Sequence, residues 1–155
     1  MKGNDQLIAK LNELLADELA AINQYFVHAE MAEDWGYGKL HEYIEKRAIE
    51  EMRHAEKHIA RILFLEGQPV VSKLGDIHIG HTIPDQFDRD HAAELDAIRD
   101  YNEAIALAVQ VHDNGTREML EDILKDEEEH IDWLESQLDL IEQIGLQTYL
   151  VEQID

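Results

Sequence analysis

The sequence predicts an all-α protein: a four-helix bundle with one long crossover connection and a short fifth helix at its C-terminal end. Apolar side chains recur at helical spacing through four long segments, and only two prolines and eight glycines occur in 155 residues. Two of the three connections between these segments are short and one is long. Short connections make consecutive helices antiparallel neighbours, whereas a long one lets the chain cross to the other end of the bundle.

The composition favours one folded domain over residues 1–155. Apolar residues make up 45% of the chain, which argues against disorder, and a chain of this length buries a substantial core. The net charge is −22, from 35 acidic and 13 basic residues. Such a chain repels nucleic acids and anionic membranes and attracts cations, so we expect neither nucleic acid nor membrane as a partner.

The absence of cysteine excludes a disulfide framework, an iron–sulfur cluster and a thiolate zinc site. The first residues lack the apolar core of a signal peptide, and no apolar run is long enough to cross a bilayer. We therefore expect a cytoplasmic protein.

Capping and stop signals divide the chain into its elements. Asn4 or Asp5 caps the first helix, Gly67 closes the second, Pro84 opens the third, and Thr116 caps the fourth after an Asn-Gly turn. The four long helices and a short amphipathic tail are predicted over residues 5–34, 40–66, 84–113, 117–144 and 146–154.

The connection over residues 68–83 is unusually long for a compact domain. Its length suffices to carry the chain from one end of the bundle to the other before the third helix begins. The tail over residues 146–154 is too short to be a stable helix alone, so we expect it to dock against the bundle.

Two copies of one ligand pattern occupy the predicted helices. In each copy a glutamate is followed three residues later by a histidine on the same helix face, and a further glutamate lies 33 residues before the first. Four glutamates and two histidines in this arrangement are the ligand set of a two-metal carboxylate site in a helical bundle. The residues are Glu18, Glu51, His54, Glu94, Glu127 and His130.

The apolar surroundings of these glutamates favour metal binding over chance. One glutamate on an apolar helix face is more often a salt-bridge partner, but here each long helix carries one near its middle. Buried carboxylates must be paired or bind a metal ion, and these helix faces offer no Lys or Arg to neutralise four of them. Oxygen ligands with one imidazole per ion and no sulfur suit iron or manganese better than copper, although zinc would also bind.

Several nearby residues have two possible roles. Tyr25, on the same face as Glu18, either hydrogen-bonds within the site or, more commonly for such a tyrosine, packs in the core. Asp126 and Asp90 are candidate acceptors for the imidazole N–H groups, and Trp133 is interpreted as a packing residue. The remaining histidines lack a paired context and are interpreted as core or surface residues: His28, His41, His58, His78, His81, His91 and His112.

Five motifs are shared with a known family. In chain order they are residues 14–26 (LLADELAAINQYF), 34–36 (DWG), 49–55 (IEEMRHA), 61–67 (RILFLEG) and 126–135 (DEEEHIDWLE). Together they resemble the bacterioferritin branch of the ferritin superfamily, over essentially the whole chain. The resemblance implies a ferritin-like fold and a hollow shell of 24 identical subunits that stores an iron mineral.

The resemblance also implies a ferroxidase activity with defined ligand roles. Pairs of iron(II) ions would be oxidised by dioxygen or peroxide at a di-iron centre inside each bundle and passed inward as iron(III). A small ferredoxin is the implied partner for iron release. The implied roles are terminal ligands for Glu18 and Glu94, bridging ligands for Glu51 and Glu127, and one histidine ligand per iron for His54 and His130.

Met52 has both a family-implied role and a packing alternative. It follows Glu51 by about 100° around the helix, so it faces away from the metal site, and spacing alone favours packing at a subunit interface. The resemblance instead implies that Met52 is an axial ligand of haem b, bound between two subunits through one methionine from each. The implied pocket walls are Ile22, Asn23, Phe26 and Ile49.

Three positions depart from the pattern of many relatives. Lys46 stands where many carry histidine, and Glu50 where they carry aspartate, at an additional iron site on the inner surface. Lys46 puts that site in doubt, and Glu45 replaces an aromatic residue near the haem.

Three other functions remain open at this point. A rubrerythrin-like peroxidase uses the same ligands but usually needs a cysteine-bearing rubredoxin domain, which this chain lacks. A haem-free ferritin differs in whether Met52 holds haem. A structural bundle stapled by divalent ions would hold fully coordinated, redox-silent metals and would unfold without them.

Overall fold

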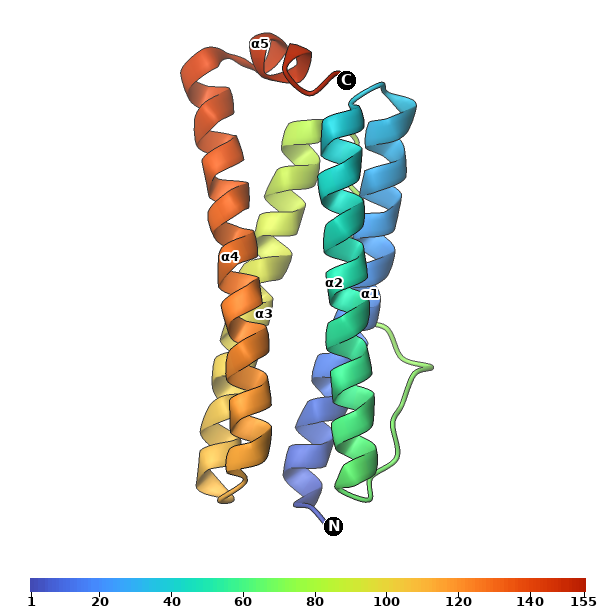
Figure 1. The fold of residues 1–155 in the computed structure, drawn as a ribbon, viewed down its shortest axis with the longest axis vertical. Coiled ribbons are helices and arrows are strands. Elements are labelled where there is room, and N and C mark those ends of the chain that lie inside the picture. The colour runs from blue at the N-terminus through green and yellow to red at the C-terminus, as the bar shows by residue number, and fades with distance from the viewer.

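The protein is an all-α bundle of four long helices and one short helix, as the sequence predicts (Figure 1). The computed structural model describes residues 1–155. No helix combines the length and the apolar character needed to cross a membrane. The helices are α1 (Asp5–Asp34), α2 (Gly38–Phe64), α3 (Ile83–Gln110), α4 (Asn114–Ile144) and α5 (Leu146–Val151).

The long helices form two antiparallel pairs, α1 with α2 and α3 with α4 (Figure 1). The connection between the pairs leaves α2 at the end where the N-terminus lies and runs along the α1–α2 pair to the opposite end, where α3 begins. This confirms the crossover that its length predicts. Several backbone N–H groups anchor it to α1. Near its end, the Gly80 N–H donates to His28 Nε2 (2.9 Å) and the His78 N–H donates to Gln24 Oε1 (3.0 Å).

The apolar core is divided into two clusters, one toward each end of the bundle. Leu7, Leu11 and Ile62 belong to the first cluster, and Ile44 and Phe87 belong to the second. Buried polar and charged side chains separate the two clusters at mid-length. The divided core therefore leaves a polar compartment at the level where the sequence predicts a metal site.

The second helix ends two residues earlier than predicted. After Phe64 the chain turns, and Glu66, rather than a glycine, takes the left-handed conformation (φ 60°). The Gly67 N–H then donates to the carbonyl of Ile62 (2.8 Å), which closes the helix end. Gly67 is thus the residue after the left-handed one, which is why a Gly stop signal places the boundary too late.

The boundary between the third and fourth helices also differs from the prediction. The third helix ends at Gln110, with His112 in the left-handed conformation (φ 60°), and the fourth begins at Asn114. Asp113 is the cap, since its Oδ1 accepts the Thr116 N–H (3.0 Å). Thr116 therefore lies inside the first helical turn and does not cap it.

The C-terminal tail docks on the end of the bundle, as predicted. Its helix, α5, crosses the end where α1 meets α2 (Figure 1). Tyr149 is fully buried, packs edge-on against Phe87 and donates its hydroxyl to Gln137 Oε1 (2.6 Å). One buried aromatic side chain with a satisfied hydroxyl thus holds a helix too short to be stable alone.

Candidate metal centre

The six predicted ligands converge in the polar compartment between the two apolar clusters. Each is at most 4% exposed, and their ligand atoms form two groups of four, within each of which the atoms lie within 4.8 Å of one another. Glu51 and Glu127 belong to both groups. The first group is Glu18, Glu51, His54 and Glu127, and the second is Glu51, Glu94, Glu127 and His130.

Each histidine turns Nδ1 toward the cluster and Nε2 away from it. His54 Nδ1 lies 3.1 Å from Glu127 and 3.2 Å from Glu51, while its Nε2 lies 2.9 Å from Asp126 Oδ2. His130 Nε2 lies 2.6 Å from Glu50 Oε2. A carboxylate outside the cluster that accepts a hydrogen bond from Nε2–H orients the imidazole, so that the Nδ1 lone pair can bind a metal ion.

These contacts agree with one prediction about the outer carboxylates and correct another. Asp126 accepts from His54 as expected, but Asp90 contacts neither ligand histidine. Instead, Asp90 Oδ1 accepts from Gln24 (2.8 Å) and lies 2.9 Å from His28 Nδ1. Asp90 therefore ties α3 to α1 beside the crossover connection. Glu50, which the sequence analysis placed only at an inner-surface iron site, was not predicted as the partner of His130.

Five buried ligand atoms of the cluster have no hydrogen-bond partner: Glu18 Oε2, Glu51 Oε1, Glu94 Oε2, Glu127 Oε1 and His130 Nδ1. Buried polar atoms normally find a partner, because leaving one unpaired costs about 1–3 kcal/mol. Here each atom offers a lone pair toward the same small volume. Such a donor set fits divalent cations of the iron and manganese type.

Crowding of the carboxylates shifts their protonation. Burial raises the pKa of Glu18 well above its ordinary value, and the neighbouring Glu51 adds to the shift. Burial and the charge of Glu51 do the same for Glu127. Burial also opposes the charge of Glu51, but the adjacent Glu18 and the two histidines hold its pKa well below the ordinary value. Part of the cluster thus holds protons that a bound metal ion would displace.

His54 is the positive partner of the first group. Burial opposes its charge, but the nearby carboxylates of Glu127, Glu18 and Glu51 outweigh burial and raise its pKa above the ordinary value. The imidazolium proton on Nδ1 then occupies the direction in which a metal ion would bind. Metal binding at this group is therefore an exchange of a proton for a cation.

Two buried tyrosines extend the cluster. Tyr25 donates its hydroxyl proton to Glu94, and Tyr101 donates its hydroxyl proton to Glu18. Of the two roles open to Tyr25, the structure therefore shows the hydrogen bond within the site. Tyr101 was not predicted as part of the site, although Tyr101 lies two turns after Glu94 on the same helix face. Behind it, His58 Nε2 lies 2.6 Å from the Tyr101 hydroxyl oxygen.

Arg47 corrects the expectation that no basic residue neutralises these carboxylates. Its Nη2 donates to Glu94 Oε1 (2.8 Å) and lies 3.6 Å from Glu51 Oε1, and its side chain is 6% exposed. Arg47 precedes Glu51 by four residues, a spacing that places two side chains on the same helix face. This spacing could have indicated from the sequence that Arg47 lies beside Glu51.

The other histidines fall into core and surface positions, as predicted. His28 and His58 are buried, and His91 pairs with Glu135 at the surface (3.1 Å), so it does not face the core on α3. Trp133 stacks on Tyr43 with ring centroids 3.7 Å apart, which agrees with its interpretation as a packing residue. A third group of possible ligand atoms lies nearer the surface, on Glu30, His41 and Glu45.

A cavity of about 560 Å³ joins the cluster to the surface between α1 and α3. Glu18 and Glu94 line its inner part, and the exposed Asp96 and Arg99 line its outer part. Aspartates outnumber arginines along it, which favours the entry of cations. The charged lining residues outside the cluster are Asp17, Asp76, Asp88, Asp96, Asp100, Arg89 and Arg99.

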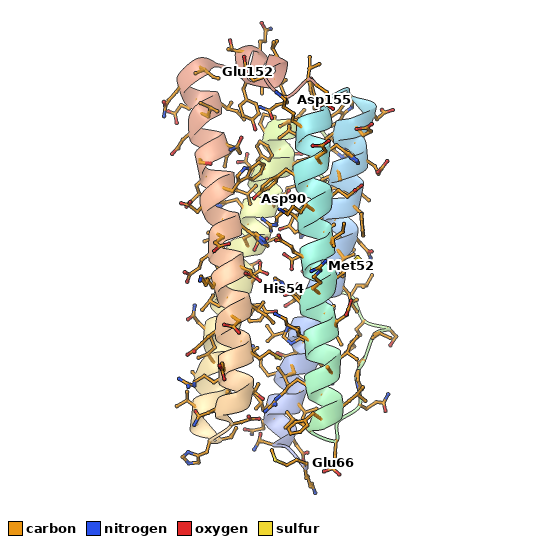
Figure 2. All side chains as sticks on the ribbon, in the orientation of Figure 1. Met52, His54, Glu66, Asp90, Glu152 and Asp155 are labelled. Carbon is orange, nitrogen blue, oxygen red and sulfur yellow. The ribbon has the colours of Figure 1, made fainter.

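Met52 lies outside this centre. Figure 2 shows His54 directed between the helix pairs and Met52 on another side of α2. Met52 is 41% exposed, and Ile49, one turn earlier on the helix, is 39% exposed. The two side chains thus form an exposed apolar patch with a thioether sulfur, consistent with the expectation that Met52 faces away from the metal ligands.

Comparison with known proteins agrees with this architecture. The ferritin family, described as a ferritin-like domain, matches residues 8–144. A bacterial ferritin of Synechocystis sp. is 44% identical over 155 residues, covering 99% of each chain. A bacterioferritin of Streptomyces coelicolor is 42% identical and covers 100% of this chain and 93% of its own. A bacterioferritin of Mycolicibacterium paratuberculosis is 41% identical over 96% of this chain and 94% of its own.

A helical bundle whose facing helices bring two overlapping carboxylate–histidine groups together defines the class of metal-binding four-helix proteins. The chain belongs to the ferritin family, in its bacterioferritin branch. Membership of this family supports iron storage as its function.

Proposed function

We propose that this protein stores and detoxifies iron by oxidising iron(II) at the six-residue cluster and holding the product as a mineral. The observation that carries the proposal is the pair of buried four-ligand groups that share Glu51 and Glu127. In this proposal the shared glutamates bridge two iron ions. Glu18 and His54 complete the ligands of one ion, and Glu94 and His130 complete those of the other.

The residues of the cluster support a two-electron oxidation. Two iron(II) ions each give up one electron, and hydrogen peroxide takes these electrons and two protons to form two water molecules. With dioxygen as the oxidant, the same electrons and protons form hydrogen peroxide. The chain binds the two substrate ions side by side and admits iron(II) through the acidic cavity. Asp126 and Glu50 orient His54 and His130 by accepting hydrogen bonds from their Nε2–H groups.

The storage role requires an assembly. We propose a shell of 24 copies of this chain, each a single ferritin-like di-iron domain over residues 1–155, because the relatives are bacterioferritins along nearly their whole length. A cytoplasmic location and a small ferredoxin as electron donor for iron release belong to the same proposal. Neither a nucleic acid nor a membrane is part of it.

Haem b is the second part of the proposal. An exposed thioether on an apolar surface is a suitable axial ligand for a haem held between two copies of the chain. Met52 would supply the sulfur, and Ile49 beside it would offer an apolar contact to the haem. Bound haem would supply one-electron transfer at the interface.

Removing one shared ligand tests the function. Glu127→Ala should slow the initial oxidation of iron(II) by about tenfold or more, because both ions lose a ligand. The measurement is the rate of iron(III) formation after rapid mixing with iron(II) and oxidant. Glu128→Ala is the matched control, since Glu128 is the exposed neighbour of Glu127 on the same helix.

Both variants should retain the wild-type assembly of about 430 kDa, which corresponds to 24 chains of 17.9 kDa. An unchanged initial rate in Glu127→Ala would contradict the site assignment. A wild-type species of one or two chains would contradict the proposed shell.

A further inference from the structure

Arg47 is the only arginine or lysine side chain that reaches the ligand cluster. It projects from α2 one turn before Glu51 and is buried, and its guanidinium donates to Glu94 Oε1 at 2.8 Å. The guanidinium carbon also lies 5.3 Å from the centre of the Tyr25 ring, a cation–π contact. An arginine keeps its charge in proteins, so the cluster contains a fixed positive charge.

This charge lies on one side of the cluster only. Neither of the ligands that belong to the first group alone, Glu18 and His54, contacts an arginine or lysine, and the charge of His54 leaves with its proton when a metal ion binds. Arg47 contacts Glu94 of the second group directly and lies 3.6 Å from Glu51, which both groups share. The two halves of the chain are otherwise alike in ligand spacing, and the residue four before Glu127 is Ile123, which is buried in the apolar core.

A ligand carboxylate held by an internal cation is less available to an external one. Glu94 Oε1 accepts from both Arg47 and Tyr25, whereas Glu18 Oε1 accepts from Tyr101 alone. A metal ion bound through the free Glu94 Oε2 must share this carboxylate with Arg47, and the guanidinium, tethered to α2, stays close by. The resulting repulsion between like charges raises the free energy of the second bound ion.

We propose that Arg47 is an internal counter-cation that makes the two metal positions unequal. The position formed by Glu18, Glu51, His54 and Glu127 fills first, and the position with Glu94 and His130 binds weakly and empties first. When that ion leaves, Arg47 still pairs with Glu94, so the carboxylate is not left without a partner. The inference rests on the proposed function, and it makes the second position one through which iron passes.

Titration with cobalt(II) tests the inequality without any redox chemistry. The probe is added to the metal-free full-length assembly, and binding is followed by calorimetry and by the visible absorption of bound cobalt. The wild type should bind two ions per chain with dissociation constants at least about tenfold apart. Arg47→Gln should tighten the second constant by about tenfold or more and leave the first nearly unchanged.

Two further variants separate charge from packing. Arg47→Lys keeps a positive charge and should keep the two constants apart. Arg61→Gln is the matched control, because Arg61 lies on the same helix but pairs with Asp113 (2.9 Å), far from the cluster. Both constants should equal those of the wild type in this control.

The outcomes distinguish the inference from the function on which it rests. Equal constants in the wild type, or the same two constants in Arg47→Gln as in the wild type, would overturn the role of Arg47 and leave the metal site intact. A wild type that binds no cobalt at the cluster would overturn the metal site and the role of Arg47 with it. Equal constants in the wild type would overturn the inference even if Arg47→Gln does not assemble.

Discussion

At the scale of single residues, the direction in which Tyr101 donates its hydroxyl proton determines which nitrogen of His58 is protonated. Tyr101 donates its hydroxyl proton to Glu18, so its oxygen can only accept from His58. His58 must therefore carry its proton on Nε2, and its Nδ1 is buried without a partner. Burial, together with the nearby positive His54, lowers the pKa of His58 to about 3. His58 is accordingly a neutral histidine inside the bundle.

This neutral state predicts a loss of stability in acid. The pKa of His58 in the folded chain, about 3, lies below its ordinary value of 6.5. Between these values the unfolded chain binds the proton and the folded chain does not, so His58 contributes stability above pH 6.5 that is lost as the pH falls. From pH 7.5 to pH 5 the loss is about 2 kcal/mol.

Replacement of His58 by glutamine isolates this contribution. His58→Gln cannot take up a proton, so its free energy of unfolding should fall less than that of the wild type over the same pH range. The comparison is made by urea unfolding in the presence of a chelator at one protein concentration. His91→Gln is the control, because His91 lies near the surface and pairs with Glu135; it should show the same loss as the wild type. Equal losses in His58→Gln and the wild type would contradict the neutral assignment.

At the scale of elements, the helix ends depend on side chains that also join one helix to another. Asp113 accepts the Thr116 N–H (3.0 Å) and hydroxyl (2.7 Å), and it pairs with Arg61 of α2 (2.9 Å). Arg61 Nε also donates to Thr116 Oγ1 (2.8 Å). One aspartate therefore caps α4 and binds this helix to the opposite pair.

Loss of this cap should destabilise the bundle. Asp113→Ala removes the acceptor for the Thr116 N–H and the partner of Arg61, at a cost of about 2 kcal/mol. Urea unfolding of the metal-free protein measures the change. Asp122→Ala, an exposed aspartate further along α4, is the control and should change stability by no more than about 0.5 kcal/mol. Equal free energies of unfolding in the two variants would contradict the role of Asp113 as a cap.

At the scale of the whole molecule, the candidate metal site and the candidate haem site lie in different places, one inside the bundle and one on its surface. The ligand cluster lies inside, between the two apolar clusters, and opens between α1 and α3. The patch with Met52 and Ile49 lies outside on α2. In the proposed shell, oxidation occurs within one chain, whereas haem binding needs two.

This separation predicts that haem and iron oxidation are lost independently. Met52→Leu should remove the visible absorption of haem while the rate of iron(II) oxidation stays at the wild-type value, because leucine has no sulfur to bind iron. Absorption spectra and oxidation rates of the same preparations measure both. Met119→Leu, the same change at a half-buried methionine beside the core, should retain the haem. An unchanged spectrum in Met52→Leu would exclude Met52 as the axial ligand.

The periodicity of the sequence sufficed to predict the fold class and to select six residues that the structure brings together. Helical spacing fixes which side chains share a face, so Glu51 with His54 and Glu127 with His130 could be paired before the fold was known. The length of the crossover connection likewise determined the arrangement of the helix pairs. That these residues bind iron stays a prediction.

Contacts between helices were decided only by the tertiary structure. The choice of Glu50 rather than Asp90 as a histidine partner, and the donation from Tyr101 to Glu18, depend on how far apart and at what rotation the helices pack. Periodicity describes one helix at a time and carries no distance between two. Arg47 is the clearest case, since its place four residues before Glu51 was visible in the sequence, but its contact with Glu94 on α3 was not.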